Sequence, residues 1–172
     1  MGLFSSSTAL NSFDDLMVEQ LQDLYDAEQR LVTALPRMAG AAHNSSLKAA
    51  FQDHLRQTQG HVSRLEQVFK ALGKPAQGKT CVAMKGLVEE GEEAVNAKGD
   101  PNVKDAALIA AAQRVEHYEI AGYGTVRTFA QRLGRSDAAR LLQQTLDEEA
   151  ATDKKLTALA EQSINPKAAA TV

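Results

Sequence analysis

The stretch Arg114-Val115-Glu116-His117-Tyr118-Glu119-Ile120-Ala121-Gly122-Tyr123 places two acids where an amphipathic helix should be apolar. Steps of three and four residues through this stretch define one helix face, and such a face normally points into a core. The face comprises Ile109, Ala112, Glu116, Glu119, Tyr123, Val126, Ala130 and Leu133. A buried carboxylate without a partner costs several kcal/mol. We therefore expect other helices to supply cations, protons or a metal ion.

The composition favours a single helical domain. The chain has 172 residues, of which 44% are hydrophobic, 24% are charged and only 5% are aromatic. This length corresponds to about one domain with one core. Ala, Leu, Gln, Glu, Lys and Arg are abundant, and these residues favour helix over strand. The sequence predicts a soluble all-α protein.

Charge and cysteine content exclude several classes of function. The net charge is -3 and acids and bases are interspersed, so we expect no nucleic-acid partner. The single cysteine, Cys81, rules out an internal disulfide and suits a reducing compartment; we interpret it as a small buried residue. The chain has neither an apolar run of about 18 residues nor a signal-peptide pattern at its start. We expect a cytoplasmic protein without a membrane partner.

Turn residues divide the chain into four long helical segments. Ser12 resembles a helix N-cap, and Gly73 and Gly134 follow apolar stripes as helix-ending residues do. The long helices are expected at about 13–40, 45–73, 102–133 and 136–165, with a flexible lead at 1–11 and a flexible tail at 166–172. Residues 73–101 should cross from one end of the bundle to the other and carry a shorter helix at 80–97. The predicted domain is therefore a helical bundle at 12–165.

Each of the other long segments also has polar residues on its apolar stripe. The first segment has only Glu28 there, the second has His54, Thr58 and His61, and the fourth has Glu149 and Asp153. Gln57 lies one step off the second stripe and can share its face. Helical residues rise by about 1.5 Å each, so residues equally far from a turn face each other. This count places Glu28 opposite the polar residues of the second segment. It places Glu116 and Glu119 opposite the acids of the fourth segment. All should meet near mid-height in the bundle.

Such a cluster is a good ligand set for one or two divalent metals, because no stripe carries a Lys or Arg. Taken singly, Glu28 could be a boundary or proton-sharing residue, and His54 could be a hydrogen-bonded core residue. We interpret His61 as structural, since two helical turns, about 10.5 Å, separate it from His54. His117 should lie beside the stripe as an outer partner or packing residue. Tyr118 and Tyr123 should be packing residues.

Several stretches match a known family over about residues 13 to 165. They are Asp23-Leu24-Tyr25-Asp26-Ala27-Glu28, Asp53-His54-Leu55 with Gln57-Thr58, Cys81 to Leu87, Asp105 to Tyr123, and Leu146-Asp147-Glu148-Glu149 with Thr152-Asp153. Through them the chain resembles the YciE/YciF-type ferritin-like stress proteins. The resemblance implies a bacterial cytoplasmic protein, a ferritin-like four-helix bundle with a long crossover carrying a fifth helix, homodimer formation and a rubrerythrin-like dimetal site.

Two departures from the wider ferritin pattern bear on that site. Ferritins and rubrerythrins carry Glu-x-x-His on two helices, a spacing absent from these helices, which have His54-x-x-Gln57, Glu116-x-x-Glu119 and Glu149-x-x-x-Asp153. Family members commonly have Glu where Gln57 stands. The neutral amide removes one charge, so the alternatives of two metals, one metal or an empty site stay open.

We expect metal binding through Glu28, His54, Glu116, Glu119 and Glu149, with Gln57 nearby and Asp153 ligating or supporting. Iron or manganese is the expected metal, and zinc also suits the donors. An active centre would oxidise iron or remove peroxide, as a dimetal oxidase, ferroxidase or peroxidase-like enzyme. The competing hypothesis is a non-enzymatic dimeric stress protein whose inward acids are protonated or paired.

Overall fold

The computed structural model describes residues 10–170, and every regular element within this range is helical. The elements are α1 (Phe13–Ala41), α2 (Ser45–Ala71), α3 (Val82–Asn96), α4 (Pro101–Arg132), α5 (Ser136–Leu159), a π-helical turn (Ala160–Ile164) and α6 (Asn165–Ala169). Most of the predicted lead at 1–11, and residues 171–172 of the predicted tail, lie outside the described range. None of the described helices has the length and apolar character needed to cross a membrane.

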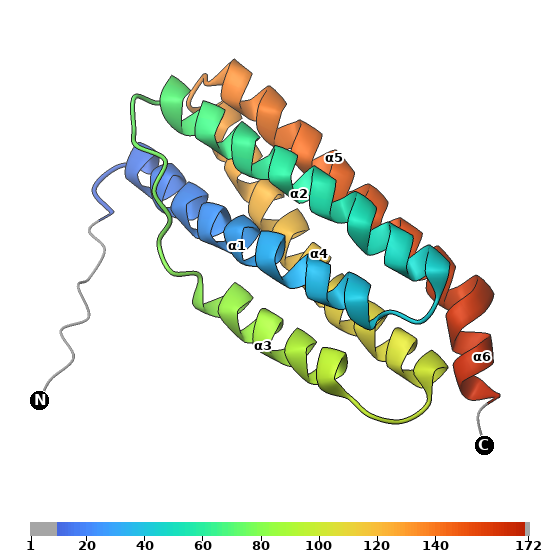
Figure 1. The fold of residues 1–172 in the computed structure, drawn as a ribbon. Helices are drawn as coiled ribbons and strands as arrows, with labels where there is room; N and C mark the ends of the chain where they lie inside the picture. Colours follow the sequence, from blue (N-terminus) through green and yellow to red (C-terminus); the bar gives the residue numbers. More distant parts are fainter. Residues whose placement is uncertain (1–9, 171–172) are drawn as a thin grey trace, which may run out of the picture.

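Four long helices form the bundle, as Figure 1 shows. The antiparallel hairpin of α1 and α2 packs against the antiparallel hairpin of α4 and α5, with α2 on α5 and α1 on α4. The crossover returns the chain along the bundle, so α2 and α4 run in the same direction. Its helix α3 packs on α1 and α4. The predicted all-α bundle with a fifth, shorter helix in the crossover is confirmed.

Local capping explains where the helices begin and end. The Ser12 hydroxyl accepts a hydrogen bond from the Asp15 backbone N–H at 3.0 Å, as expected for an N-cap. Gly73 and Gly134 adopt left-handed φ angles of 66° and 69° after α2 and α4. The residue after each glycine donates its backbone N–H to a carbonyl five residues earlier, which satisfies an otherwise free helix-end group.

Side chains and backbone groups of α1 fix the crossover. The backbone N–H of Lys79 donates to the Gln22 carbonyl at 3.1 Å, and that of Cys81 donates to Asp26 Oδ2 at 2.8 Å. The Cys81 side chain is fully buried, and burial raises the pKa of its thiol, as expected for a packed residue rather than a nucleophile. The crossover therefore holds α3 against the bundle.

The C-terminal helix continues beyond its predicted end at Asn165-Pro166. A π-helical turn, Ala160–Ile164, leads directly into α6, which ends at Ala169. Pro166 lies in the first turn of α6, where a residue needs no backbone N–H for the helix ladder. The proline therefore starts a new helical segment, and only part of the tail predicted at 166–172 is non-helical within the described residues.

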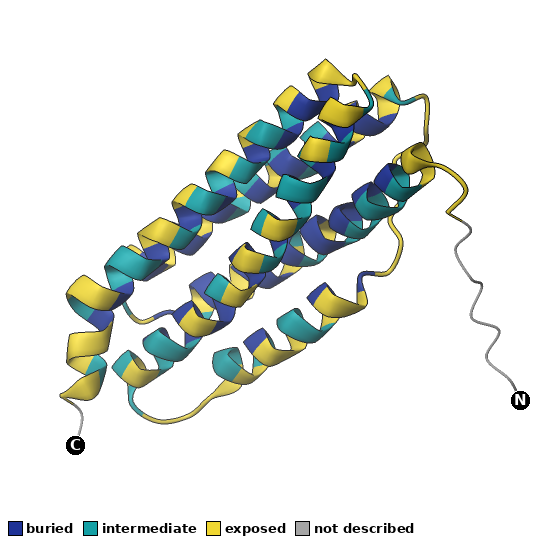
Figure 2. Cartoon of the chain, turned by 180° about the vertical axis from the view of Figure 1, so that it is seen from behind, coloured by how far each residue is buried: buried dark blue, intermediate teal, exposed yellow. Residues whose placement is uncertain are grey.

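The bundle core consists of two apolar clusters with a polar layer between them. One cluster includes Leu31, Phe51 and Leu108, and the other includes Leu21, Val68 and Val126. Figure 2 shows that the buried residues lie on the inner faces of the helices. Both buried histidines and all of the buried glutamates lie between the two clusters, whereas the buried Asp105 accepts hydrogen bonds from the His43 and Asn44 backbone N–H groups near the start of α4. The fold thus carries its buried glutamates and histidines at mid-height, as predicted.

Candidate metal centre

All four long helices contribute buried ionisable side chains to this layer. Each of these side chains belongs to a residue with at most 2% of its surface exposed. They are Glu28 on α1, His54 and His61 on α2, Glu116 and Glu119 on α4, and Glu149 on α5. The predicted meeting of the apolar stripes is therefore observed.

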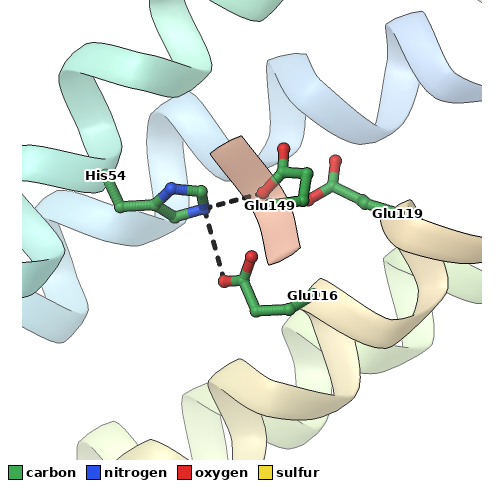
Figure 3. A group of neighbouring side chains, drawn as sticks. All are labelled: His54, Glu116, Glu119 and Glu149. Carbon is green, nitrogen blue, oxygen red and sulfur yellow. Dashed lines mark ion pairs between the residues drawn. The ribbon is translucent and has the colours of Figure 1, made fainter. Parts of the chain in front are cut away.

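The first group comprises His54, Glu116, Glu119 and Glu149, drawn in Figure 3. One potential ligand atom from each residue lies within 4.8 Å of all the others. His54 Nε2 lies 3.3 Å from Glu116 Oε1 and 3.6 Å from Glu149 Oε2. One imidazole and three carboxylates are thus close enough together to hold one metal ion.

The second group comprises Glu28, His61 and Glu149, again with ligand atoms within 4.8 Å of one another. His61 Nδ1 lies 3.3 Å from Glu28 Oε1 and 2.8 Å from Glu149 Oε1. Glu149 therefore presents Oε1 to the second group and Oε2 to the first. The two groups form one centre with a shared carboxylate.

His61 belongs to this centre, although the sequence interpretation treated it as structural. The ring centroids of His54 and His61 are only 6.2 Å apart, because side chains can lean along a helix toward each other. The backbone rise alone therefore overstated their separation. Counting residues from the turn already placed His61 at the same level as Glu28, and this was the sequence signal that indicated its place in the centre.

Gln57 lies at the outer edge of the centre rather than in either group. Its Oε1 lies 3.3 Å from His54 Nδ1 and accepts a hydrogen bond from the Thr152 hydroxyl at 3.3 Å. Thr152 Oγ1 also lies 3.2 Å from His54 Nδ1. The amide therefore contacts the ring nitrogen that faces away from the carboxylates.

Asp153 lies farther out, on the α4 side of α5. Asp153 Oδ1 accepts a hydrogen bond from Gln113 at 3.0 Å and lies 3.4 Å from Nε2 of His117, whose side chain is 70% exposed. Neither group contains Asp153, so a supporting role fits the structure better than ligation. His117 lies beside the stripe, as expected.

Tyr123 closes the centre on the side of the second group. Its side chain is fully buried, and its hydroxyl donates a hydrogen bond to Glu28 Oε1 at 2.5 Å. Burial, followed by the charge of Glu28, raises the pKa of Tyr123 well above its usual value. Tyr123 is thus a protonated donor to Glu28 as well as a packing residue.

The carboxylates hold protons on both imidazoles. Burial alone lowers the pKa of a histidine. At His54, Glu116 and Glu149 outweigh burial and raise the pKa to about 9. At His61, Glu149 and Glu28 outweigh it and raise the pKa to about 10.

The glutamates divide between neutral and ionised forms. Burial raises the pKa of Glu116 to about 8 despite the nearby His54. Burial and the neighbouring carboxylates raise the pKa of Glu119 well above its usual value. At Glu149 the histidines outweigh burial and lower the pKa. Without a metal, protons compensate most of the negative charge.

Many of the inward oxygens make no hydrogen bond. Among residues 10–170, the buried carboxylate oxygens without a hydrogen bond are Glu28 Oε2, Glu116 Oε2, both oxygens of Glu119 and both oxygens of Glu149. The two Glu149 oxygens have only ion-pair contacts, with the ring nitrogens of His61 and His54. Buried polar atoms are usually hydrogen-bonded, and exceptions need an explanation such as a missing ion. The donor set therefore fits a bound metal.

The donors also match the composition of known dimetal centres. Ferritin-like dimetal proteins use four carboxylates and two histidines, with one histidine from each of two helices. Here the two groups together contain Glu28, Glu116, Glu119 and Glu149 with two histidines, both of which come from α2. The missing Glu-x-x-His spacing thus reflects a different placement of the second histidine, not its loss.

The fold and the buried centre together define a ferritin-like four-helix bundle with a carboxylate–histidine cluster. Residues 12–169 match the family model described as "Domain of unknown function (DUF892)". The chain therefore belongs to this family. It is 46% identical to protein YciF of Escherichia coli (strain K12) over 160 residues, which are 92% of this chain and 96% of YciF. The predicted relation to the YciE/YciF-type proteins is confirmed.

Solved structures agree with this relation. The crystal structure of the E. coli stress protein YciF has a TM-score of 0.87, covering 90% of this chain and 98% of that one, at 46% identity. YcfI, described as a putative structural protein from Rhodopseudomonas palustris, has a TM-score of 0.84 at 42% identity, with coverage of 90% and 98%. A Xanthomonas campestris protein shares the fold at 21% identity, with a TM-score of 0.71 and coverage of 91% and 96%.

Proposed function

We propose that this protein binds two divalent transition-metal ions in the core of its bundle. The observation that carries the proposal is the set of buried, unpartnered carboxylate oxygens around two histidine nitrogens. His54, Glu116 and Glu119 would hold one ion, Glu28 and His61 would hold the other, and Glu149 would contact both. Four ionised glutamates balance two divalent cations, which explains why so many acids share one layer.

Iron or manganese is the metal that we propose, with zinc as a further fit to these donors. Carboxylate and imidazole ligands suit all three metals. Bound iron or manganese would supply redox chemistry with dioxygen or peroxide. The residues of the chain would hold the ions, exclude water through the apolar clusters on either side, and keep Glu28 oriented through the Tyr123 hydroxyl.

Metal analysis of the purified protein tests this proposal. After growth with added iron and manganese, we expect about two metal ions per chain, as in two-metal sites. Glu149→Ala should lose most of this metal because it removes the shared ligand, whereas Asp147→Ala, at an exposed neighbouring position, should keep it. Less than about a tenth of a metal ion per chain in the wild-type protein would contradict the proposal.

Activity is a separate question from metal content. Ferrous iron added to the metal-free protein under air should be oxidised faster than in buffer if the centre is a ferroxidase. Peroxide consumption by the loaded protein tests the peroxidase-like alternative. A loaded protein that does neither is a metal-binding protein without this enzymatic activity.

A second candidate function is a non-enzymatic stress protein. The observation that favours it is that the inward nitrogens of His54 and His61 lie 2.8–3.3 Å from oxygens of Glu116, Glu28 and Glu149. These contacts raise the pKa of both histidines, so imidazolium ions can compensate the buried charge without a metal. The relative YciF is described as a stress protein, and we propose a stress-related role in either case. Buried, unpaired Cys81 also supports our proposal of a cytoplasmic location.

We further propose that the protein is a homodimer through the outer face of α1 and α2. A hollow of about 230 Å³ on this face is lined by Gln29, Val32, Gln59 and Val62. The centre of this face is free of charge. Steps of three and four carry Gln22, Tyr25, Gln29, Val32 and Pro36 on α1 and Gln52, Leu55, Gln59 and Val62 on α2, and the charged Glu66 follows at the edge, where Tyr25 contacts it. Interface centres are depleted in charged residues. The α2/α5 face, in contrast, carries Asp53, Arg56, Arg64, Glu148 and Lys155.

A further inference from the structure

The two histidines of the centre turn opposite ring nitrogens inward. His54 directs Nε2 at Glu116 and Glu149, and His61 directs Nδ1 at Glu28 and Glu149. These inward nitrogens are buried and make no hydrogen bond. The outward nitrogens, His54 Nδ1 and His61 Nε2, both have hydrogen-bond partners. The pattern is the one expected of metal ligands fixed by outer partners.

The partner of His61 is charged and itself firmly held. His61 Nε2 donates to Glu148 Oε2 at 2.8 Å. Arg64 approaches both oxygens of Glu148, with Nη2 at 2.7 Å from Oε1 and Nη1 at 2.9 Å from Oε2. Arg64 Nη1 also donates to the Thr145 hydroxyl at 3.1 Å. Such two-pronged pairs fix the carboxylate in position and orientation.

The partners of His54 are neutral. Its Nδ1 lies 3.3 Å from Gln57 Oε1 and 3.2 Å from Thr152 Oγ1. The Thr152 hydroxyl donates to the same amide oxygen, so that oxygen is an acceptor for both groups. An N–H on Nδ1 is the ring donor that satisfies this arrangement. Nε2 faces the carboxylates, and its proton is the one that a bound metal ion would replace.

We infer that Glu148, held by Arg64, is the positioning residue that makes His61 an Nδ1 ligand, while Gln57 and Thr152 make His54 an Nε2 ligand. The inference rests on the proposed metal centre and adds its outer layer. It gives Gln57 a role as a hydrogen-bond acceptor rather than a ligand. It also makes the two halves of the centre unequal, because a carboxylate partner increases the basicity of an imidazole more than an amide does.

The outer layer also lies against the surface. A groove of about 600 Å³ between α2 and α5 is lined by Gln57, Arg64, Glu148 and Thr152, together with Ala50, Asp53, Arg56, Gly60, Ala151 and Lys155. The four supporting side chains therefore separate both histidines from solvent. Their replacement alters the support of the centre without removing a proposed ligand.

Zinc, which is diamagnetic, allows the ring nitrogens to be observed directly. In the zinc-loaded protein with ¹⁵N-labelled histidine, long-range ¹⁵N–¹H spectra should show zinc on Nδ1 and a proton on Nε2 for His61. His54 should show the reverse. Zinc on Nε2 of His61 in the wild-type protein would overturn the inference while leaving the proposed metal centre standing.

Variants test the role of Glu148 through zinc affinity. Glu148→Ala should weaken the binding of one of the two zinc ions by about tenfold or more, the usual effect of losing an outer partner of a ligand. Glu148→Gln should recover much of this affinity, because the amide oxygen still accepts from Nε2. Asp147→Ala is the matched control, since Asp147 is exposed and receives its hydrogen bond from Gln143 on the same helix.

The outcomes separate the two proposals. Wild-type protein that binds two zinc ions, with Glu148→Ala within about threefold of it at both, overturns the positioning role alone. A loss of folding stability in Glu148→Ala with unchanged zinc affinity and unchanged ring spectra also overturns it, since this result describes a purely structural ion pair. Wild-type protein that binds neither zinc, iron nor manganese overturns both the metal centre and its outer layer.

Discussion

The hydrogen bond between Tyr123 and Glu28 shows how single residues hold the centre together. Both side chains are fully buried, so the hydroxyl is a donor that no water can replace easily. A buried acceptor left without its donor costs about 1–3 kcal/mol. The order of the centre therefore depends on residues outside the proposed ligand set.

Tyr123→Phe should lower the free energy of unfolding of the metal-free protein by about 1–3 kcal/mol. Tyr25→Phe is the control, because the Tyr25 hydroxyl donates at 3.0 Å to Glu66, an exposed residue that water can solvate instead. Urea denaturation of the two variants measures the difference. Equal losses in both would show that burial of the acceptor does not matter here.

The ionisable residues predict a loss of stability of the metal-free protein at high pH. The pKa of Glu116 is raised from 4.5 to about 8, so the folded state binds this proton more tightly than the unfolded state does. The resulting contribution to folding stability is lost as pH rises from 4.5 to about 8. The pKa values of His54 and His61 are raised from 6.5 to about 9 and 10, so their contribution is complete below pH 6.5 and is lost as pH rises through those values. All three raised pKa values make the folded protein less stable as pH rises. The lowered pKa of Glu149 matters only in acid.

The melting temperature in the presence of a chelator should therefore fall between pH 6 and pH 9, by at least about 4 °C. Glu116→Gln removes one of the titrating groups and should reduce this fall. Metal-loaded protein should show a smaller fall, since metal ions rather than protons then compensate the glutamates. A melting temperature that is constant or higher at pH 9 would contradict the assignment of protons to the centre.

Capping residues in the sequence correctly predicted where the long helices begin and end, but not that the chain continues as a helix after Asn165-Pro166. Ser12, Gly73 and Gly134 have the predicted roles, because capping depends on a few neighbouring residues. Asn165-Pro166 carries an equally clear stop signal, and the chain nevertheless continues as α6. The buried side chain of Ile164 packs in the core beside this junction, so tertiary packing outweighs the local signal.

Gly122 on α4 lies closely against the Leu24 side chain of α1. A Cβ atom at Gly122 would lie 2.7 Å from Leu24 Cδ2, whereas one at Gly124, on the same helix, would meet nothing within 4 Å. Gly124→Ala should therefore stabilise the protein by about 0.5–1 kcal/mol through helix propensity. Gly122→Val should destabilise it by about 1–3 kcal/mol, because the buried Leu24 side chain must shift or the two helices must separate.

Thermal or urea denaturation of these two variants measures how much stability depends on the space beside Gly122. Gly122→Val should also weaken metal binding, since Glu119 and Glu28 lie on the same pair of helices. A Gly122→Val variant as stable as the wild type would show that Leu24 moves aside without cost.

For the whole molecule, the proposed dimer predicts a mass of two chains in solution. Val32→Glu and Val62→Glu would each place a charge in the uncharged centre of the α1/α2 face and should shift the protein toward the monomer, since unpaired charges in an interface are costly. Lys155→Glu on the α2/α5 face is the control for a change of surface charge. Light scattering gives the mass, and a wild-type monomer would contradict the proposal.

Metal should also stabilise the molecule as a whole. A ligand that binds only the folded state adds about 2.7 kcal/mol when present at 100 times its dissociation constant. Chelation should therefore lower the melting temperature by several degrees, and re-addition of the metal should restore it. The Glu149→Ala variant should respond to neither treatment, and a wild-type protein that also fails to respond would contradict the metal centre.

The sequence by itself determined the helices, the crossover and the level at which the polar residues meet. The rise per residue of a helix is constant, so counting from the turns was enough to bring Glu28, His54 and Glu116 to one layer. The same regularity placed Glu119 and Glu149 with them. These features depend on backbone periodicity, which local sequence specifies.

The tertiary structure alone decided which atoms form the centre. Asp153 turns toward Gln113, His61 leans toward His54, and Glu148 reaches His61 although it lies next to Glu149 in sequence. Helix periodicity fixes the position of each Cα atom but leaves several rotamers open, and only contacts between helices select one of them. For this reason the layer could be predicted from the sequence, whereas the inward nitrogens and their outer partners could not.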